Sequence, residues 1–166
     1  YPDVEFVVGD MNDLPFEKDS FDFVYSSLAV HYSEEPESVY NEIYRVLNNA
    51  GRLLVSVGHP LRWACDEVEI NNTKHRIISH GVDNENREVY GNYNTFARHD
   101  HYFKNGEVLS FYVGSPSFHF KKLKNAGFVI EDFSEGICTE ECKSIDYNYW
   151  NKYHEIPQFM AFLAKK

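Results

Sequence analysis

The sequence has little of three features that would each point to a class of protein. It contains only three cysteines, Cys65, Cys138 and Cys142, which are too few and too scattered for a disulfide framework. It has no block of Lys or Arg and carries a net charge of −10, whereas a nucleic-acid groove needs a basic face. No apolar run approaches the roughly 20 residues that a bilayer crossing requires. We therefore expect a cytoplasmic protein that binds neither nucleic acid nor membrane.

What remains is the composition of one globular domain. The 166 residues are 43% hydrophobic and 16% aromatic, which is enough apolar material for a core. The chain opens at Tyr1, Pro2 and Asp3 without a Met, a few residues ahead of an apolar run. We therefore expect it to be the downstream part of a longer protein.

The opening stretch holds two short apolar runs with abrupt polar ends. Residues 4–8 (VEFVV) are followed by Gly-Asp-Met, and residues 21–25 (FDFVY) are followed by two serines. A run rich in β-branched and aromatic residues that stops in this way is typical of a buried strand that leads into a loop. Ligands of open α/β sheets bind at the carboxyl ends of such strands. The sequence therefore predicts a ligand edge in this stretch.

A strand–helix–strand unit is predicted next. Ser33 as a capping hydroxyl and Pro36 in the first turn predict the start of a helix, and Gly51 is expected to end it in the left-handed conformation. The apolar positions of this helix fall on one face: Val39, Ile43, Val46 and Leu47. Residues 53–57 (LLVSV) then predict a strand that is buried on both faces and parallel to the strand at 21–25.

The rest of the chain contains one long irregular stretch and a regular end. Residues 58–114 read as turns between short aromatic-rich pieces, and long excursions of this kind often form substrate walls. A short helix capped by Ser115 and ended by Gly127 follows. Two further strands are predicted at residues 129–133 and 159–164.

At this point the sequence resembles a known family. Residues 9–32 (GDMNDLPFEKDSFDFVYSSLAVHY) and 53–60 (LLVSVGHP) are similar to the class I S-adenosylmethionine-dependent methyltransferases, and most similar to the small-molecule group related to the quinone-biosynthesis methyltransferases. The closing runs at 121–133 and 156–166 resemble the last helix and terminal hairpin of that family. The resemblance implies an α/β fold with a Rossmann-like sheet, mostly parallel with a C-terminal antiparallel hairpin. It makes residues 1–166 the C-terminal portion of a single methyltransferase domain, with 58–114 as a substrate-side insertion.

The resemblance also implies that part of the fold is not in this sequence. The family carries a glycine-rich loop after its first strand, and no G-x-G pattern occurs here. The chain would begin at the family's third strand and would lack the first two strands. Unpaired backbone groups are costly when they are buried. We therefore expect a missing N-terminal segment or a partner chain to fill the gap. A homodimer is a separate option for the assembly of this protein.

The cofactor that the resemblance implies is S-adenosylmethionine. Asp10 would accept a hydrogen bond from the adenine amino group, and the backbone N–H of Met11 would meet a ring nitrogen. Ser26, Ser27 and Leu28 would lie against the methionine part and the reactive methyl group. The competing interpretation is an ordinary turn at Asp10 and an ordinary strand-to-helix loop after residue 25.

His31 and Tyr32 are the candidate catalytic residues. Methyl transfer is an in-line displacement, so catalysis consists mainly of placing the nucleophile, and a base helps where the acceptor is a hydroxyl. His31 titrates near neutrality and follows the predicted strand end closely. The alternative is a structural role, in which His31 caps the next helix or packs under Tyr32.

Three residues of the long excursion are candidates for acceptor binding: His59, Trp63 and Tyr102. The aromatic residues of this stretch, Phe103 and Phe111 among them, form either a satellite core or the walls of an apolar pocket. His99, His101 and His119 invite a metal interpretation, but no matching Cys or carboxylate set supports it, so we expect no metal.

The prediction for function is methyl transfer from S-adenosylmethionine to a small-molecule acceptor. The alternatives are a non-catalytic relative that serves as an interaction module and, with less support, a nucleotide-binding oxidoreductase of similar fold. The acceptor itself is not indicated by the sequence.

Overall fold

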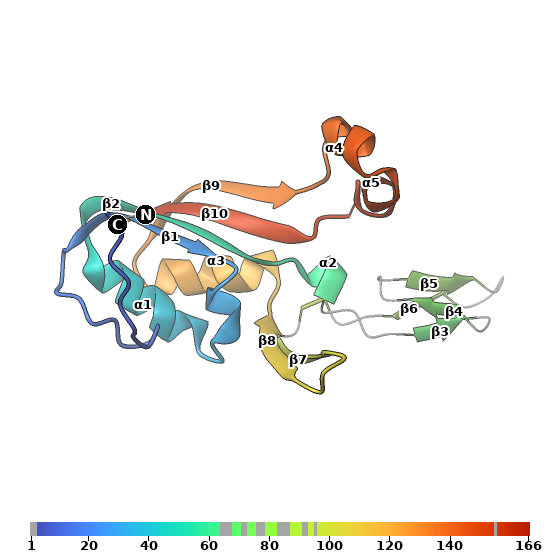
Figure 1. Ribbon diagram of the computed structural model, residues 1–166, viewed down its shortest axis with the longest axis horizontal. Coiled ribbons are helices and arrows are strands. Elements are labelled where there is room, and N and C mark those ends of the chain that lie inside the picture. The colour runs from blue at the N-terminus through green and yellow to red at the C-terminus, as the bar shows by residue number, and fades with distance from the viewer. Residues whose placement is uncertain are drawn as a thin grey trace.

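The computed structural model describes residues 3–63, 68–70, 73–75, 79–82, 87–90, 93–94, 96–154 and 156–166 (Figure 1). Its elements in chain order are β1 (Phe21–Ser27), the 3-10 helix η1 (Val30–Tyr32), α1 (Pro36–Val46), β2 (Leu47–Gly58), α2 (Pro60–Trp63), β3 (Val68–Ile70), β4 (Thr73–His75), β5 (Ser79–Val82), β6 (Arg87–Tyr90), β7 (Ala97–Tyr102), β8 (Val108–Val113), α3 (Pro116–Asn125), β9 (Val129–Gly136), α4 (Glu140–Ile145), α5 (Tyr147–Tyr153) and β10 (Phe159–Lys165).

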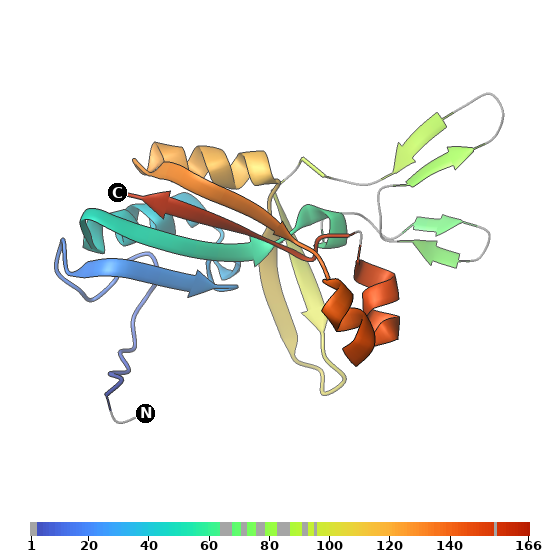
Figure 2. The ribbon, with the colours of Figure 1, turned by 90° about the horizontal axis from the view of Figure 1, so that it is seen from above.

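The main sheet has four strands in the order β1-β2-β10-β9. β1 and β2 are parallel, whereas β10 runs antiparallel to both β2 and β9. The predicted C-terminal antiparallel hairpin is therefore confirmed. The prediction of a mostly parallel sheet is wrong for the described residues, because one of these three pairings is parallel. The strands β3 to β8 form three separate antiparallel hairpins outside this sheet (Figure 2).

Helices α1 and α3 lie side by side and cover one face of the sheet (Figure 1). Side chains at alternate positions of β2 and β10 face them, and the core consists largely of Val39, Tyr40, Ile43, Leu53, Val55, Leu123, Met160 and Phe162. Ser115 caps α3 through a bond from the Phe118 N–H, and Gly127 follows it at a φ of +104°. Both features agree with the predictions for this helix.

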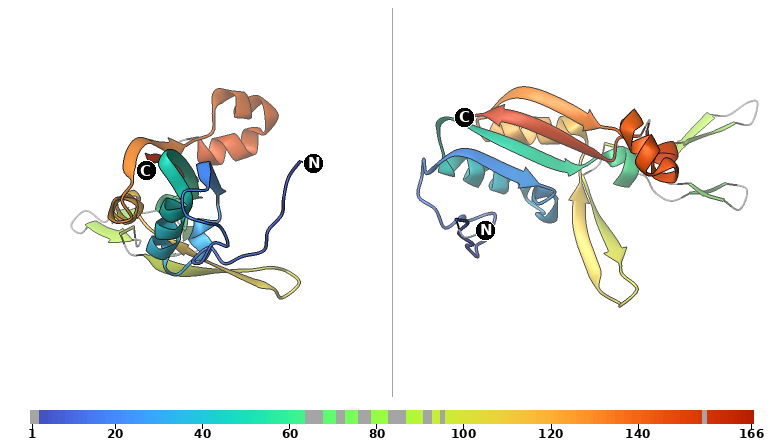
Figure 3. Two further views of the ribbon diagram at one scale, coloured as in Figure 1. Left: turned by 90° about the vertical axis from the view of Figure 1, so that its left-hand side faces the viewer. Right: turned by 45° about the horizontal axis from the view of Figure 1, so that its top comes forward.

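The predicted strand at residues 4–8 is wrong. These residues have no regular structure, and Phe6 and Val8 are 86% and 100% exposed. The run has the composition of a strand, but no strand of the described sheet lies beside it, and a strand is stable only with a partner. Figure 3 shows this N-terminal segment running away from the sheet.

Three details around α1 and β2 also differ from the predictions. Ser33 lies before the N-cap residue Glu35 and accepts a hydrogen bond from its N–H. Ala50, not Gly51, takes the left-handed conformation, with a φ of 70°. Residues 53–57 alternate between buried and half-buried, because α1 and α3 cover only one face of the sheet.

Among the described helices, none is long and apolar enough to cross a membrane.

Candidate functional site

The chain leaves β1 through a strained residue. Leu28 follows Ser26 and Ser27 and has a φ of 52°, a conformation that costs a residue with a Cβ about 1–2 kcal/mol. Its N–H donates to the backbone oxygen of Ser56 in β2 at 3.0 Å, which holds this conformation. The backbone therefore turns sharply at the carboxyl end of β1 and enters η1.

A cavity of about 440 Å³ lies beside this turn. Its walls come from the loop after β1, the end of β2, the start of β10 and the hairpin β7–β8, and they consist of Leu28, His31, Tyr32, Gly58, His101, Phe103, Leu109, Phe111 and Phe159. The described residues that line it carry no carboxylate, ammonium or guanidinium group. The cavity is therefore largely apolar, with imidazole and phenol groups as its polar side chains.

His31 is the half-buried titratable residue of this cavity. Burial lowers the pKa of His31, so the imidazole is neutral at pH 7. Its ring contacts those of Tyr32 and Phe111, with centroids 4.4 and 6.0 Å away. Its Nδ1 is buried and has no hydrogen-bond partner among the described residues. A neutral imidazole with one ring nitrogen inside the protein is suited to contact a bound molecule with the other.

Asp10 lies in a tight turn, in which its backbone oxygen accepts from the Asp13 N–H at 3.1 Å. Its Oδ1 accepts hydrogen bonds from the backbone N–H and the side-chain amide of Asn12, at 2.8 and 3.0 Å. These bonds lower the pKa of the exposed Asp10 carboxyl, so it is ionised at neutral pH. The turn is linked to the residue after η1, because the Ser33 hydroxyl donates to the Asn12 Oδ1 at 3.4 Å. The two ends of the predicted ligand edge are therefore neighbours.

Two residues of α1 hold the loop that follows this turn. Arg45 donates to the backbone oxygens of Leu14 and Phe16 at 3.0 and 2.8 Å, and Glu42 accepts from the Leu14 N–H at 3.0 Å. Sequence reasoning missed both residues. The signal was the i, i+3 acidic–basic pair on a helix face that the apolar pattern leaves open.

His59 is buried outside the cavity. Its Nδ1 accepts from the Leu61 N–H at 3.2 Å, so its Nε2 carries the hydrogen of the neutral ring and donates to Glu135 at 2.8 Å. These bonds tie the end of β2 to β9. Burial lowers the pKa of His59 despite the nearby carboxylate.

The other predicted site residues are placed as follows. Met11 packs partly buried against the core. Trp63 is the last residue of α2. Tyr102 is 72% exposed, whereas its neighbours His101 and Phe103 line the cavity. The functional roles of all three remain predictions.

The hairpin β7–β8 supplies cavity residues that the sequence left undecided. Phe103 and Phe111 had two interpretations, a satellite core or a pocket wall, and the structure places both in the wall. Leu109 joins them and was not predicted. Its spacing of two from Phe111 puts both on one face of a strand, which was the available signal.

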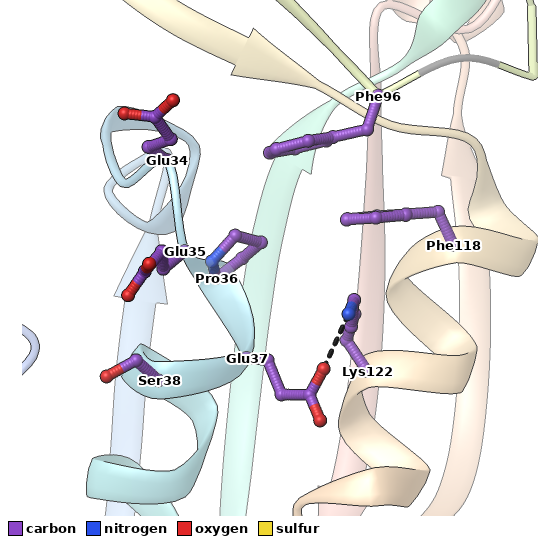
Figure 4. Close-up of a pocket in the computed structure, with 8 residues that line it drawn as sticks. All are labelled: Glu34, Glu35, Pro36, Glu37, Ser38, Phe96, Phe118 and Lys122. Atoms are coloured by element: carbon purple, nitrogen blue, oxygen red, sulfur yellow. Dashed lines mark hydrogen bonds and ion pairs between the residues drawn. The ribbon is translucent and has the colours of Figure 1, made fainter.

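A second hollow of about 340 Å³ lies between the start of α1 and α3 (Figure 4). It contains three glutamates, but its lysine is already paired, because Lys122 donates to Glu37 at 2.5 Å and lies over the Phe118 ring. Phe96 stacks on Phe118 with centroids 4.4 Å apart. These contacts connect α1, α3 and the residue that precedes β7.

Within the described residues no three His, Cys, Asp or Glu side chains come together in a way that would hold a metal ion.

Comparison with known sequences identifies a methyltransferase match. Residues 1–55 match the family described as methyltransferase domain. A sterol 24-C-methyltransferase of Saccharomyces cerevisiae is 35% identical over 81 residues, which are 48% of this chain and 20% of that protein. A malonyl-[acyl-carrier protein] O-methyltransferase of Herminiimonas arsenicoxydans is 48% identical over 50 residues, which are 30% of this chain and 19% of that protein. The match thus spans about a fifth of the length of these relatives.

Comparison with solved structures extends the match to the fold. An S-adenosylmethionine-dependent methyltransferase from Mesorhizobium loti superposes with a TM-score of 0.73 and 22% identity, covering 95% of this chain and 68% of that one. At this identity the likeness shows the fold alone.

Proposed function

We propose that this chain is part of a class I S-adenosylmethionine-dependent methyltransferase domain that transfers a methyl group to a small-molecule acceptor. Residues 1–55 match the methyltransferase domain family, and the fold is that of a solved S-adenosylmethionine-dependent methyltransferase. The acceptor binds in the cavity at the carboxyl ends of β1 and β2. The observation that supports this is the convergence of Leu28, His31 and Tyr32 on one cavity directly after β1. Carboxyl ends of parallel strands are the ligand edge of open α/β sheets.

The residues present suit two parts of the cofactor. The ionised, exposed carboxylate of Asp10 is an acceptor for the adenine amino group, beside the backbone N–H of Met11. Ser26 and Ser27 end β1 and Leu28 forms the turn beside the acceptor cavity, and all three are proposed to border the methionine part. When bound, S-adenosylmethionine supplies an electrophilic methyl group on a sulfonium. The task of this chain is then to place the acceptor atom in line with that group.

The cavity favours an acceptor that is largely apolar and uncharged. Its aromatic and aliphatic walls lack a fixed charge, and a charged acceptor group without a partner would be poorly solvated there. The sequence resembles the quinone-biosynthesis methyltransferases. We therefore include ring-shaped molecules among the apolar, uncharged acceptors proposed for this cavity. The acceptor-side wall is the hairpin β7–β8, within the predicted insertion at residues 58–114.

We also propose that a further segment or a partner chain covers β1. β1 is at the edge of the described sheet, and Phe23 and Tyr25 on its uncovered face are 52% and 63% exposed. Exposed apolar strands at a sheet edge favour pairing with another strand. The covering segment would supply the strands and the glycine-rich loop that the family resemblance implies.

The test is calorimetric titration of S-adenosylhomocysteine into this chain and into any longer protein that contains it. We expect Asp10→Asn to weaken binding about tenfold, the loss expected for one charge-assisted hydrogen bond. Asp132→Asn, a substitution on β9 away from the cavity, is the matched control and should leave the affinity unchanged. Absence of binding in both proteins contradicts the proposal and favours the non-catalytic interaction module.

A further inference from the structure

Two histidines near the cavity each have a buried ring nitrogen with no hydrogen-bond partner among the described residues. They are Nδ1 of His31 and Nε2 of His119. His119 is 1% exposed and lies in α3, beneath the sheet. A buried polar atom that stays unpaired costs about 1–3 kcal/mol, so two such atoms in one core call for an explanation.

Tyr40 determines which nitrogen of His119 carries the hydrogen. The Tyr40 hydroxyl is 2.9 Å from His119 Nδ1, and burial raises the pKa of Tyr40, so the hydroxyl keeps its hydrogen. Tyr40 is fully buried, and the arrangement that satisfies its O–H is donation to His119 Nδ1. Burial lowers the pKa of His119 to about 3, so its ring is neutral and its hydrogen is on Nε2. The unpartnered Nε2 of His119 is therefore a donor.

The two rings are close enough for electrostatic interaction. Burial is the main cause of the lowered pKa of His119, and the charge of His31 adds to it. Val30, the residue before His31, is fully buried in the same core cluster as Tyr40 and Leu123, and Leu123 lies one turn after His119 on α3. A buried donor thus lies near a buried acceptor site on a neighbouring element.

We propose that His119 is a positioning residue for His31: its Nε2–H donates to one buried water, which donates to His31 Nδ1, so that His31 presents its Nε2–H to the cavity. Buried waters commonly bridge polar atoms that are otherwise unpaired. The inference rests on the proposed function, since it names the atom with which His31 meets the acceptor. It also limits the class of acceptors, because His31 then donates a hydrogen bond to the acceptor and does not remove a proton from it. The acceptor presents a lone pair to His31, and its nucleophilic atom does not depend on His31 as a base.

The test is the tautomer of both histidines in the full chain without cofactor. The chain is labelled with 15N-histidine, and long-range proton–nitrogen spectra at about pH 7.5 are assigned with His31→Gln and His119→Gln. We expect the Nε2–H form for both rings. In Tyr40→Phe, His119 should become a mixture of tautomers and the His31 signals should shift. Tyr44→Phe, one turn further along α1 and packed on Phe128, is the matched control and should change neither ring.

Two results would overturn the proposal. One is the Nδ1–H form of His31 in the unmodified chain, a measurement that needs no variant to fold. The other is an unchanged His31 tautomer and chemical shift in a His119→Gln chain whose circular dichroism is that of the unmodified protein. The spectra are recorded without cofactor, so they test the tautomer of His31 independently of S-adenosylhomocysteine binding. Either proposal can therefore be contradicted while the other holds.

Discussion

At the scale of single residues, the proposed role of His31 predicts the effect of its substitution on turnover. We expect His31→Ala to lower turnover at least about tenfold with little change in S-adenosylhomocysteine affinity, because the proposed function has this ring contact the acceptor and not the cofactor. Turnover is measured as S-adenosylhomocysteine released with a panel of apolar acceptors. Unchanged turnover would remove His31 from the mechanism.

A second substitution at the same position separates two roles of this side chain. Glutamine keeps an N–H near the position of the histidine Nε2 but cannot act as a base. If His31 donates a hydrogen bond, His31→Gln should retain clearly more turnover than His31→Ala. Equal loss in both variants would favour the base that the sequence suggested. His154→Gln, at the residue that follows α5, is the control and should be fully active.

The lowered pKa of His119 predicts that the stability of the protein depends on pH. Its pKa is about 3 in the folded protein against about 6.5 when unfolded, so the unfolded chain binds the extra proton between these values. The free energy of unfolding should therefore fall as the pH drops below about 6.5, by up to about 1.4 kcal/mol per pH unit for this one proton. His31 and His59, whose pKa values are also lowered, add to the same trend.

The measurement is urea unfolding at several pH values between about 7 and 5, above the range in which carboxylates titrate. The slope for His119→Gln should be smaller than that of the unmodified chain by up to one proton. An unchanged slope in His119→Gln would mean that this ring is charged in the folded state.

Sequence position alone placed some candidate residues correctly beside the cavity and placed another wrongly. Leu28, His31 and Tyr32 could be placed at the ligand edge because residues just after a strand end cannot lie far from it. His59 also follows a strand, yet its side chain is buried on the helix-covered face. The alternation of Val55 and Val57 continues to His59, and its N–H pairs with the Gln158 oxygen as if the strand went on. The period of two was the signal for its direction.

At the scale of elements, α1 controls the loop that carries the proposed adenine contact. We expect Arg45→Gln to destabilise the protein by about 2 kcal/mol, because two backbone oxygens lose a charged donor. Amide exchange of residues 10–16 should accelerate, and S-adenosylhomocysteine should bind more weakly.

Arg52→Gln is the control for this change. Arg52 pairs with Glu131 on the surface, where an ion pair contributes little, so its loss should cost less than about 0.5 kcal/mol. Hydrogen exchange followed by mass spectrometry measures both variants. Equal exchange at residues 10–16 in the two variants would contradict the anchoring role of Arg45.

At the scale of the whole molecule, the two faces of the sheet should respond differently to substitution. Phe162→Ala should cost about 3–5 kcal/mol, because the ring is 2% exposed and packs under α3. Phe23→Ser should cost less than about 1 kcal/mol in this chain, because the ring is half exposed on the uncovered face. Chemical denaturation measures both.

The same pair of substitutions tests whether another segment covers β1. In a longer protein or complex that pairs with β1, Phe23→Ser should become several times more costly, while the cost of Phe162→Ala should stay the same. An equal, small cost of Phe23→Ser in all contexts would contradict the proposed covering segment.

Local sequence determined those features of this protein that depend on neighbouring residues. The spacing of apolar residues in α1, the serine cap and glycine end of α3, and the runs that form β1, β9 and β10 all act within a few residues. For the same reason, position along the chain was enough to place His31 and Tyr32, which follow β1 closely, beside the cavity.

Tertiary structure decided what depends on contacts between distant segments. Residues 4–8 have the composition of a strand but no partner to pair with, and β2 is half exposed because helices cover only one face. The hairpin β7–β8 becomes a cavity wall only by lying across the end of β1. The unpaired nitrogens of His31 and His119, which are 88 positions apart in the sequence, come near each other only when η1 and α3 enter one core. Composition and spacing do not predict these contacts between distant segments, because the packing of the whole chain determines which residues are buried and which residues they contact.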